Sequence, residues 1–264
     1  MTKEKLASAF AAVAEKDEKA FVAYIMAGDG GLSSLKEKIL HLQEIGVTVV
    51  EIGIPFSDPV ADGPVIQEAG QRALAQGVTL DKVLKELASF QNEVSIPLVV
   101  MTYLNPVYRY GLERFAEDCV KAGISGAIIP DVPLEEEDEI RDPMKRHSLA
   151  LIRLVTLTSP ESRIKNIAQD AEGFIYAVTV NGITGARTTF KENVPSYLKK
   201  IKELSPVPVL AGFGVSSSEQ AAELGKHCDG VIVGSKIVEL FHTGNQEAIR
   251  EIIPKKAGQT VQAE

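Results

Sequence analysis

One short segment of the chain combines a carboxylate in an apolar strand with two further carboxylates in the turn behind it. The segment starts as Val47-Thr-Val-Val-Glu51 and continues through a proline- and glycine-rich turn that holds Asp58 and Asp62. A glutamate in a strand covered on both faces loses solvation, which disfavours its charged form. Such a group could give and take a proton near neutral pH, while an aspartate in a wetter loop stays ionised. The alternative is a structural glutamate bound by backbone amides, with two turn-forming aspartates.

Short apolar runs rich in β-branched residues recur along the chain and alternate with amphipathic segments. We predict strands at Ala20–Met26, Val47–Ile52, Leu98–Thr102, Gly126–Ile129, Ala150–Thr156, Phe174–Thr179, Val207–Ala211 and Gly230–Val233. We predict helices between them at Ser33–Ile45, Leu112–Ala122, Leu134–Arg146, Ser162–Ala171, Val194–Leu204 and Ser217–Leu224, where apolar residues recur about every 3.6 positions. Glycine stops at Gly46, Gly123 and Gly225 should end three of these helices.

Strict alternation of strands and helices predicts a parallel sheet, because parallel neighbours need a crossover connection. Eight such units in 264 residues favour a single α/β domain over residues 1–264, a closed (β/α)8 TIM barrel. The alternative is an open doubly wound sheet, which would place a glycine fingerprint after its first strand. The turn at residues 27–31 lacks that G-x-G-x-x-G spacing.

Three segments depart from simple alternation. Lys3–Glu15 predicts an extra N-terminal helix that could close the barrel floor, and residues 63–92 after the second strand are long enough for two helices with a break near Gly77. The polar end, Ala257–Glu264, predicts a frayed tail of about eight residues. Arg153 places a charge inside the fifth strand. Its side chain could form a buried pair with a carboxylate or point outward to solvent, and the sequence leaves both alternatives open.

Composition limits the classes of function. The net charge of −8 argues against binding to nucleic acid or an anionic membrane, and no apolar stretch is long enough to span a bilayer. No signal peptide is visible, and Cys119 and Cys228 lie far apart without metal-ligand spacing, so we expect reduced thiols and a cytoplasmic location. We predict no metal and no cofactor, because no phosphate-binding loop, dinucleotide fingerprint or metal cluster is present.

Unusual residues follow the predicted strands, as expected if the loops at the carboxyl ends of the strands build a site. Glycines come after the seventh and eighth strands, in Gly212-Phe213-Gly214 and Gly234-Ser235. Glycine lets the backbone approach a ligand, and a following helix offers unpaired amides to an anion. The sequence therefore predicts a phosphate site at these two loops. Thr184-Gly185 after the sixth strand could add amides and act as a lid.

These motifs together resemble the tryptophan synthase alpha chain family. The most specific is the run from Glu51 to Pro64, which contains Pro-Phe-Ser-Asp-Pro-Val-Ala-Asp-Gly-Pro. The likeness continues in family order through Met101-Thr-Tyr-Leu-Asn-Pro106, Pro130-Asp-Val-Pro133, Gly173-Phe-Ile-Tyr176, Gly182-Ile-Thr-Gly185, Gly212-Phe-Gly214 and Gly234-Ser235. The resemblance implies a carbon–carbon lyase that cleaves indole-3-glycerol phosphate to indole and glyceraldehyde 3-phosphate. It also implies transfer of indole to a pyridoxal-phosphate-dependent beta subunit in an α2β2 complex that makes L-tryptophan.

The resemblance implies a role for each matching residue. Glu51 would be the general acid and base, Asp62 would bind the indole N–H, and Tyr176 would line the site and take part in catalysis. Substrate-binding positions would be Tyr24, Tyr103, Ile128, Leu154 and Thr184, the last also ordering the lid beside Asp62. Phosphate-binding positions would be Gly185, Phe213, Gly214, Gly234 and Ser235, and positions at the partner interface would be Asp58, Pro59 and Asn105.

Three other functions stay open on the sequence. One is a different phosphate-binding barrel enzyme, an isomerase or synthase, against which the absence of lysine at the key strand ends argues. Another is a chain that mainly binds and regulates a partner enzyme. The last is an indole-producing lyase that needs no partner, and adding a beta subunit would then bring no increase in rate.

Overall fold

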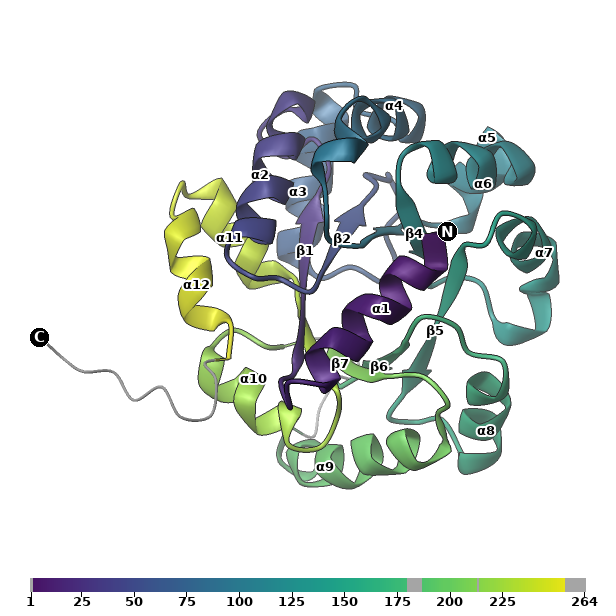
Figure 1. Ribbon diagram of the computed structural model, residues 1–264, viewed down its shortest axis with the longest axis vertical. Helices are drawn as coiled ribbons and strands as arrows, with labels where there is room; N and C mark the ends of the chain where they lie inside the picture. Colours follow the sequence, from purple (N-terminus) through teal and green to yellow (C-terminus); the bar gives the residue numbers. More distant parts are fainter. Residues whose placement is uncertain (1, 180–186, 213, 255–264) are drawn as a thin grey trace, which may run out of the picture.

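A closed parallel barrel forms the centre of the molecule. The computed structural model describes residues 2–179, 187–212 and 214–254, and within these ranges eight strands pair in sequence order and close from β8 back to β1 (Figure 1). The strands are β1 (Ala20–Met26), β2 (Val49–Gly53), β3 (Leu98–Met101), β4 (Ile124–Ile128), β5 (Ala150–Thr156), β6 (Ile175–Val178), β7 (Val209–Gly212) and β8 (Gly230–Val233). The predicted (β/α)8 barrel is confirmed, and an open sheet is excluded.

The bounds of β2 correct one expectation about Glu51. The predicted strand was Val47–Ile52, with the glutamate at its end, but β2 runs from Val49 to Gly53. Thr48 precedes β2, and its side chain accepts a hydrogen bond from the Phe21 amide of β1 at 3.0 Å. Glu51 is consequently the middle residue of β2, in register with Tyr24 of β1 and Val99 of β3. Its side chain lies inside the barrel rather than on the rim.

The barrel interior is filled by side chains from alternate strand positions, and its floor is closed by α1 (Thr2–Ala14). Leu6 and Phe10 of α1 belong to the same buried cluster as Val22, Ile152 and Phe174 of the strands and their connections. The Phe10 and Phe174 rings meet edge to face with centroids 5.7 Å apart. α1 crosses the barrel end obliquely (Figure 1), so the predicted extra helix and its capping role are confirmed.

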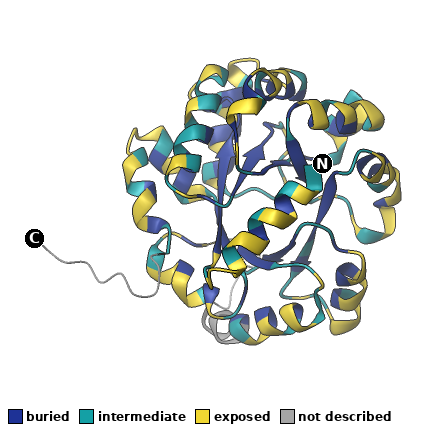
Figure 2. Cartoon of the chain, viewed as in Figure 1, coloured by how far each residue is buried: buried dark blue, intermediate teal, exposed yellow. Residues whose placement is uncertain are grey.

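Helices surround the barrel, and their buried residues face inward while their exposed residues face outward (Figure 2). The longer ones are α2 (Leu35–Glu44), α3 (Pro64–Ala75), α4 (Leu80–Phe90), α6 (Leu112–Lys121), α7 (Asp138–Arg146), α8 (Glu161–Gln169), α9 (Arg187–Leu204), α10 (Ser218–Gly225) and α11 (Ser235–His242). The two helices expected after the second strand are α3 and α4. They break at Gly77, whose φ of 68° favours glycine, and Thr79 caps α4 by accepting from the Lys82 amide.

Several helix predictions need correction. No helix was predicted around Asn105, yet this segment forms α5 (Leu104–Tyr110). Pro106 occupies its first turn and breaks no intrahelical hydrogen bond. α9 starts at Arg187 rather than Val194 and continues through Pro195. Gly225 is the last residue of α10 and not a left-handed stop, unlike Gly46 and Gly123, which have φ of 89° and 72°. A Cβ at Gly225 would lie 3.2 Å from the Lys19 side chain, so glycine makes room there.

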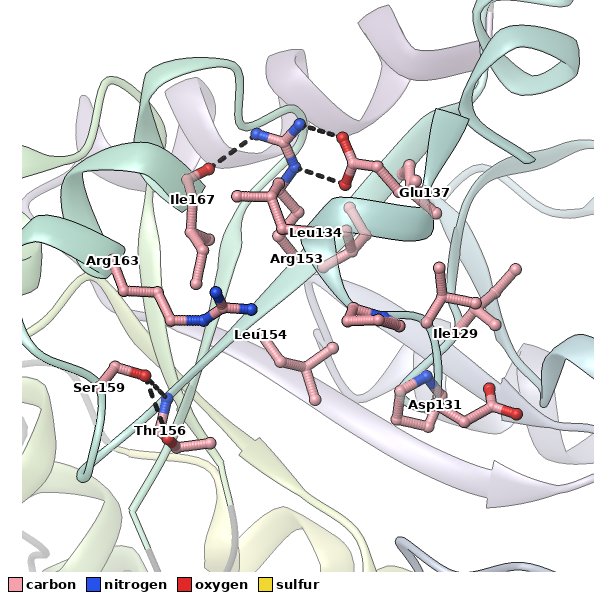
Figure 3. Close-up of a pocket in the computed structure, with 15 residues that line it drawn as sticks. Ile129, Asp131, Leu134, Glu137, Arg153, Leu154, Thr156, Ser159, Arg163 and Ile167 are labelled. Atoms are coloured by element: carbon pink, nitrogen blue, oxygen red, sulfur yellow. Dashed lines mark hydrogen bonds and ion pairs between the residues drawn. The ribbon is translucent and has the colours of Figure 1, made fainter. Parts of the chain in front are cut away.

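The structure also decides the pose of Arg153 in β5. Its guanidinium is buried and donates from Nε to Glu137 Oε2 at 3.0 Å, with a second, shorter bond from Nη2 to Oε1. Nη1 donates to the Ile167 carbonyl at 2.8 Å, which places the group between β5, α7 and α8 (Figure 3). Arg153 therefore forms a buried ion pair. Among the helices of the described ranges, none is long and apolar enough to cross a membrane.

Candidate active site

Glu51 carries a buried carboxyl group in the middle of β2. It is 1% exposed, and its Oε2 atom has no hydrogen-bond partner in the part of the chain that the structure describes. Burial raises the pKa of Glu51 to about 8, and the nearby charge of Asp62 adds to the rise. A carboxyl group in this range holds its proton at neutral pH and can also release it, as a general acid and base requires.

Asp62 lies in the turn between β2 and α3 and is half-buried. The turn is closed by a hydrogen bond from the Asp62 amide to the Pro59 carbonyl at 3.1 Å, and Gln67 Nε2 donates to the Asp62 carbonyl at 2.8 Å. Burial raises the pKa of Asp62 to about 6, and a hydrogen bond from Tyr103 opposes that rise. With these pKa values, Asp62 is mostly ionised at pH 7 while Glu51 is mostly protonated.

Two tyrosines of the barrel interior occupy gaps made by glycines on the next strand. A Cβ on Gly53 would lie 1.9 Å from the Tyr24 hydroxyl, and one on Gly212 would lie 2.2 Å from the Tyr176 ring. In both cases the glycine stands two residues beyond the register partner of the tyrosine. The negative charges of Glu51 and Asp62 contribute to the raised pKa of each tyrosine, after burial itself. Both hydroxyls therefore lie within the electrostatic reach of the two carboxylates.

Apolar residues continue the site toward β4 and β5. Ile128 is fully buried in the barrel interior, and Leu154 lines a cavity of about 480 Å³ beside the carboxyl ends of these strands (Figure 3). Glu51 and Asp62 do not line this cavity. Ile128 belongs to the buried cluster of the barrel interior that also contains Tyr176, and Leu154 packs against this cluster.

The predicted phosphate site is described only in part. β7 and β8 are paired neighbours, so Gly214 and Gly234 follow adjacent strand ends. Ser235 begins α11, whose first intrahelical bond runs from the Val238 amide to the Gly234 carbonyl at 3.1 Å. The amides of residues 235–237 thus precede the first bond of the helix and are oriented as an anion site requires. Thr184, Gly185 and Phe213 lie outside the described residues.

Comparison with known proteins assigns the family. The family model described as tryptophan synthase alpha chain matches residues 10–263. A tryptophan synthase alpha chain from Oceanobacillus iheyensis is 51% identical over 261 residues, covering 99% of this chain and all of that one. The chain belongs to the tryptophan synthase alpha chain family.

Further relatives of this alpha chain agree in sequence and fold. One from Bacillus cereus is 53% identical over 250 residues, or 95% of each chain. A solved chain from Aquifex aeolicus VF5 superposes with a TM-score of 0.87 at 36% identity, covering 94% of this chain and 96% of that one. Tryptophan synthase from M. tuberculosis, in an open form with BRD0059 bound, gives a TM-score of 0.83 at 32% identity, with 93% and 94% covered.

The three predicted interface residues of this alpha chain lie on one exposed rim. Asp58 and Asn105 are exposed and Pro59 is partly so. Beside them stand two unusually exposed apolar residues, Val60 at 84% and Tyr108 at 61%. Val60 follows Pro59 in the turn after β2, and Tyr108 lies on α5, about one helical turn after Asn105.

A metal site receives little support from the side chains of the described ranges. One group there, Glu113, Glu117 and His147, brings possible ligand atoms within 4.8 Å of one another. Glu113 is already paired with Arg146 and with His147, whose Nε2 lies 2.8 Å from Glu113 Oε1. The group lies on the surface of α6 and the end of α7, away from Glu51. We assign no catalytic step to this group of side chains.

Proposed function

We propose that this alpha chain cleaves indole-3-glycerol phosphate to indole and glyceraldehyde 3-phosphate, with Glu51 as general acid and base and Asp62 as the partner of the indole nitrogen. The observation that carries the proposal is the buried carboxyl group of Glu51 inside the barrel. Its Oε2 atom has no hydrogen-bond partner among the described residues, and its pKa of about 8 lies above the value of about 6 for Asp62. Retro-aldol cleavage needs one group that donates and then accepts a proton, and a second that remains an anion.

The reaction balances with these two carboxyl groups alone. Glu51 gives its proton to C3 of the indole ring, which places positive charge on the ring nitrogen. Asp62 stabilises this cation by accepting a hydrogen bond from the indole N–H. The ionised Glu51 then takes the proton of the glycerol hydroxyl next to the ring. The carbon–carbon bond breaks, its electron pair returns to the ring, and indole and an aldehyde leave with Glu51 protonated again.

The remaining predicted residues bind and orient the substrate in this proposal. The first-turn amides of α11, with Gly214 and Gly234, hold the phosphate, and Phe213 and Gly185 belong to the same proposed cradle. Tyr24, Ile128 and Leu154 surround the indole, Tyr176 faces the reacting carbons from across the barrel, and Thr184 orders the lid. Excluding water strengthens the interaction of Asp62 with the cation.

We also propose that the rim with Asp58, Pro59 and Asn105 binds a tryptophan synthase beta subunit in an α2β2 complex. The exposure of Val60 and Tyr108 on that rim supports the assignment. We also propose a cytoplasmic location, which is consistent with a biosynthetic step that passes indole to this partner. An alpha chain that works in this way should release more indole per second after the beta subunit is added, whereas an independent lyase should not.

The test compares Glu51→Gln with Glu139→Gln, a matched change at an exposed position of α7. Indole release by the purified chain should fall at least about a thousandfold in Glu51→Gln, as expected when a general acid and base is removed from a two-step proton transfer. Glu139→Gln should retain the full rate. Substantial indole release by Glu51→Gln would exclude the role assigned to Glu51. If the unmodified chain released no indole even with the beta subunit present, a regulatory protein would be favoured instead.

A further inference from the structure

A groove on the outside of the barrel lies between α4, α5 and the loop that follows β2. It has a volume of about 730 Å³ and is lined by Asn105, one of the predicted interface positions. Its walls also include apolar side chains and aromatic rings, those of Phe56, Leu74, Val78, Leu80 and Tyr110. Volumes of about 300–1,000 Å³ are typical of pockets that hold a ligand, so this α4–α5 groove can accept side chains of a partner. α4 and α5 are neighbours at this edge of the molecule (Figure 1).

Arg109 brings an uncompensated positive charge to the α4–α5 groove. It is exposed in the last turn of α5 and forms neither an ion pair nor a hydrogen bond within the described ranges. Every other arginine whose side chain the structure describes forms an ion pair, namely Arg72, Arg114, Arg141, Arg146, Arg153, Arg163 and Arg250. The chain has a net charge of −8, yet no acid of the described residues reaches Arg109. Its guanidinium donors are therefore free for a carboxylate from outside the chain.

Arg109 lies on the same face of α5 as the predicted interface. Asn105, Tyr108 and Arg109 follow a spacing of three and four residues, which places them side by side on a helix, and all three are exposed. Val107, between them in the sequence, is fully buried. Because Asn105 belongs both to the rim and to the groove wall, the two surfaces are continuous. Tyrosine and arginine are also enriched among the residues that dominate binding energy at protein interfaces.

We propose that the α4–α5 groove receives a segment of the beta subunit that carries an acidic side chain beside an apolar one, and that Arg109 binds the acid. The inference rests on the proposed partner and names the chemistry that the partner must present. In the complex the apolar side chain covers Leu74, Val78 and Leu80, and the carboxylate accepts hydrogen bonds from both sides of the guanidinium fork. Loss of water from the groove strengthens the pair, because two charges attract more strongly where the dielectric constant is lower.

The experiment titrates the full alpha chain with the purified beta subunit of the same organism and measures the dissociation constant. It should rise about tenfold in Arg109→Gln and further in Arg109→Glu, because the acid of the partner loses its counter-charge and then meets a like charge. Added salt should reduce the difference between the variants, since part of the attraction acts across water before contact. Indole release by the alpha chain alone should be unchanged, because neither Glu51 nor Asp62 lines the groove.

Arg250→Gln is the matched control. Arg250 lies on α12 (Ile249–Ile252), across the barrel from α5 (Figure 1), and its side chain is 51% exposed. The same charge is removed there, so an effect of net charge on the complex would appear in both variants. We expect the dissociation constant of Arg250→Gln to equal that of the unmodified chain.

A second measurement identifies the segment that enters the groove. Leu74→p-benzoylphenylalanine places a photo-reactive ring on the groove wall without changing the charge of the chain. After illumination of the complex, peptide mapping should find a cross-linked beta-subunit segment with an aspartate or glutamate next to an apolar residue. Changing that acid to arginine should restore binding to Arg109→Glu, which a merely structural effect of the Arg109 substitution would not allow.

Three results would overturn the inference while leaving the proposed partner in place. One is an unchanged dissociation constant in Arg109→Gln, and another is a cross-linked segment without an acid. The third is an alpha-chain dimer, measured by sedimentation without beta subunit, that Arg109→Gln dissociates, because a second copy would then occupy the groove. The proposed partner fails in a different way: the unmodified chain would not bind the beta subunit at all, and the inference would fall with it.

Discussion

Two buried ionisable sites on the same barrel differ in how their charge is compensated. Inside the barrel, the Glu51 carboxyl group has an oxygen without a hydrogen-bond partner among the described residues. Outside it, between β5 and α7, Glu137 and Arg153 satisfy each other through two hydrogen bonds, with Arg141 and the Ile167 carbonyl completing the network. Both carboxyl groups are less than 5% exposed. Burial alone therefore does not distinguish a catalytic group from a structural one.

The difference between the two sites is the presence of a partner. A buried charge that is paired and fully hydrogen-bonded contributes a fixed geometry. A buried carboxyl group left without a partner has a shifted pKa, and such shifts gather at functional sites. The paired charges of Glu137 and Arg153 lie on the outer face of the barrel, whereas the carboxyl group of Glu51 lies inside it. Substitutions at each site should therefore change different properties of the molecule.

The largest effect is expected for Glu51→Gln, which should remove activity and increase stability. The folded-state pKa of Glu51, about 8, lies above the unfolded value of 4.5. The carboxyl group therefore costs the folded state increasing free energy as the pH rises from about 4.5 to 8. At pH 7 this cost is on the order of 3 kcal/mol, which the neutral amide avoids. Urea unfolding at pH 5 and pH 7 checks this, since the stability gain should be below about 1 kcal/mol at pH 5 and on the order of 3 kcal/mol at pH 7.

The outer pair should respond in the opposite way. Glu137→Leu leaves the Arg153 charge buried with only the Ile167 carbonyl, and we expect a loss of about 3–5 kcal/mol in the free energy of unfolding. Arg153→Met should cost less, because Arg141 still reaches Glu137 at 3.2 Å. The rate of indole release per folded molecule should be unchanged in both. A double variant, Glu137→Leu with Arg153→Met, should recover most of the stability if burial of an unpaired charge is the cause.

A smaller effect is expected where shape rather than charge is changed in the barrel mouth. Gly53→Ala would place a methyl group 1.9 Å from the Tyr24 hydroxyl, so the ring must leave its position. We expect a loss of about 1–3 kcal/mol in stability, as for overpacked cores, together with reduced kcat/KM. Gly70→Ala is the control, since its new Cβ would meet only Met26 Cε at 3.6 Å in the middle of α3. It should be neutral or slightly stabilising because alanine favours helix.

The fold could be predicted further from the sequence than the contacts of the site. The alternation of apolar strands with amphipathic helices is a local pattern, so it predicted the barrel, α1, and the pair α3 and α4. α5 was not predicted, because its seven residues are too few to show a helical period. Within the site, Glu51 and Asp62 were predicted from their own segment and from family resemblance.

Contacts between distant segments could not be predicted in this way. Arg153 finds Glu137 on a different element, and the Tyr103 hydroxyl meets an amide 42 residues away. The gap for Tyr24 depends on the register of β1 against β2, which places Gly53 two residues beyond its partner. Thr184, Gly185 and Phe213 lie outside the described residues, so their predicted roles stay predictions. The sequence thus predicts which residues could carry chemistry, while the contacts that these residues make depend on the closure of the barrel.

The smallest effect is expected from Thr102→Val, which tests whether an unpaired buried group always serves function. Thr102 is fully buried at the end of β3, and its Oγ1 atom has no hydrogen-bond partner in the described ranges, as with Glu51 Oε2. Unlike a carboxyl group, a hydroxyl cannot exchange a proton near neutral pH, so its lack of a partner gives no catalytic advantage. Valine has the same shape without the unsatisfied oxygen, and stability should rise by about 1 kcal/mol with kcat/KM unchanged. Thermal unfolding measures the stability and an indole assay measures kcat/KM. A loss of activity would contradict this prediction and would mean that the Thr102 hydroxyl supports the site.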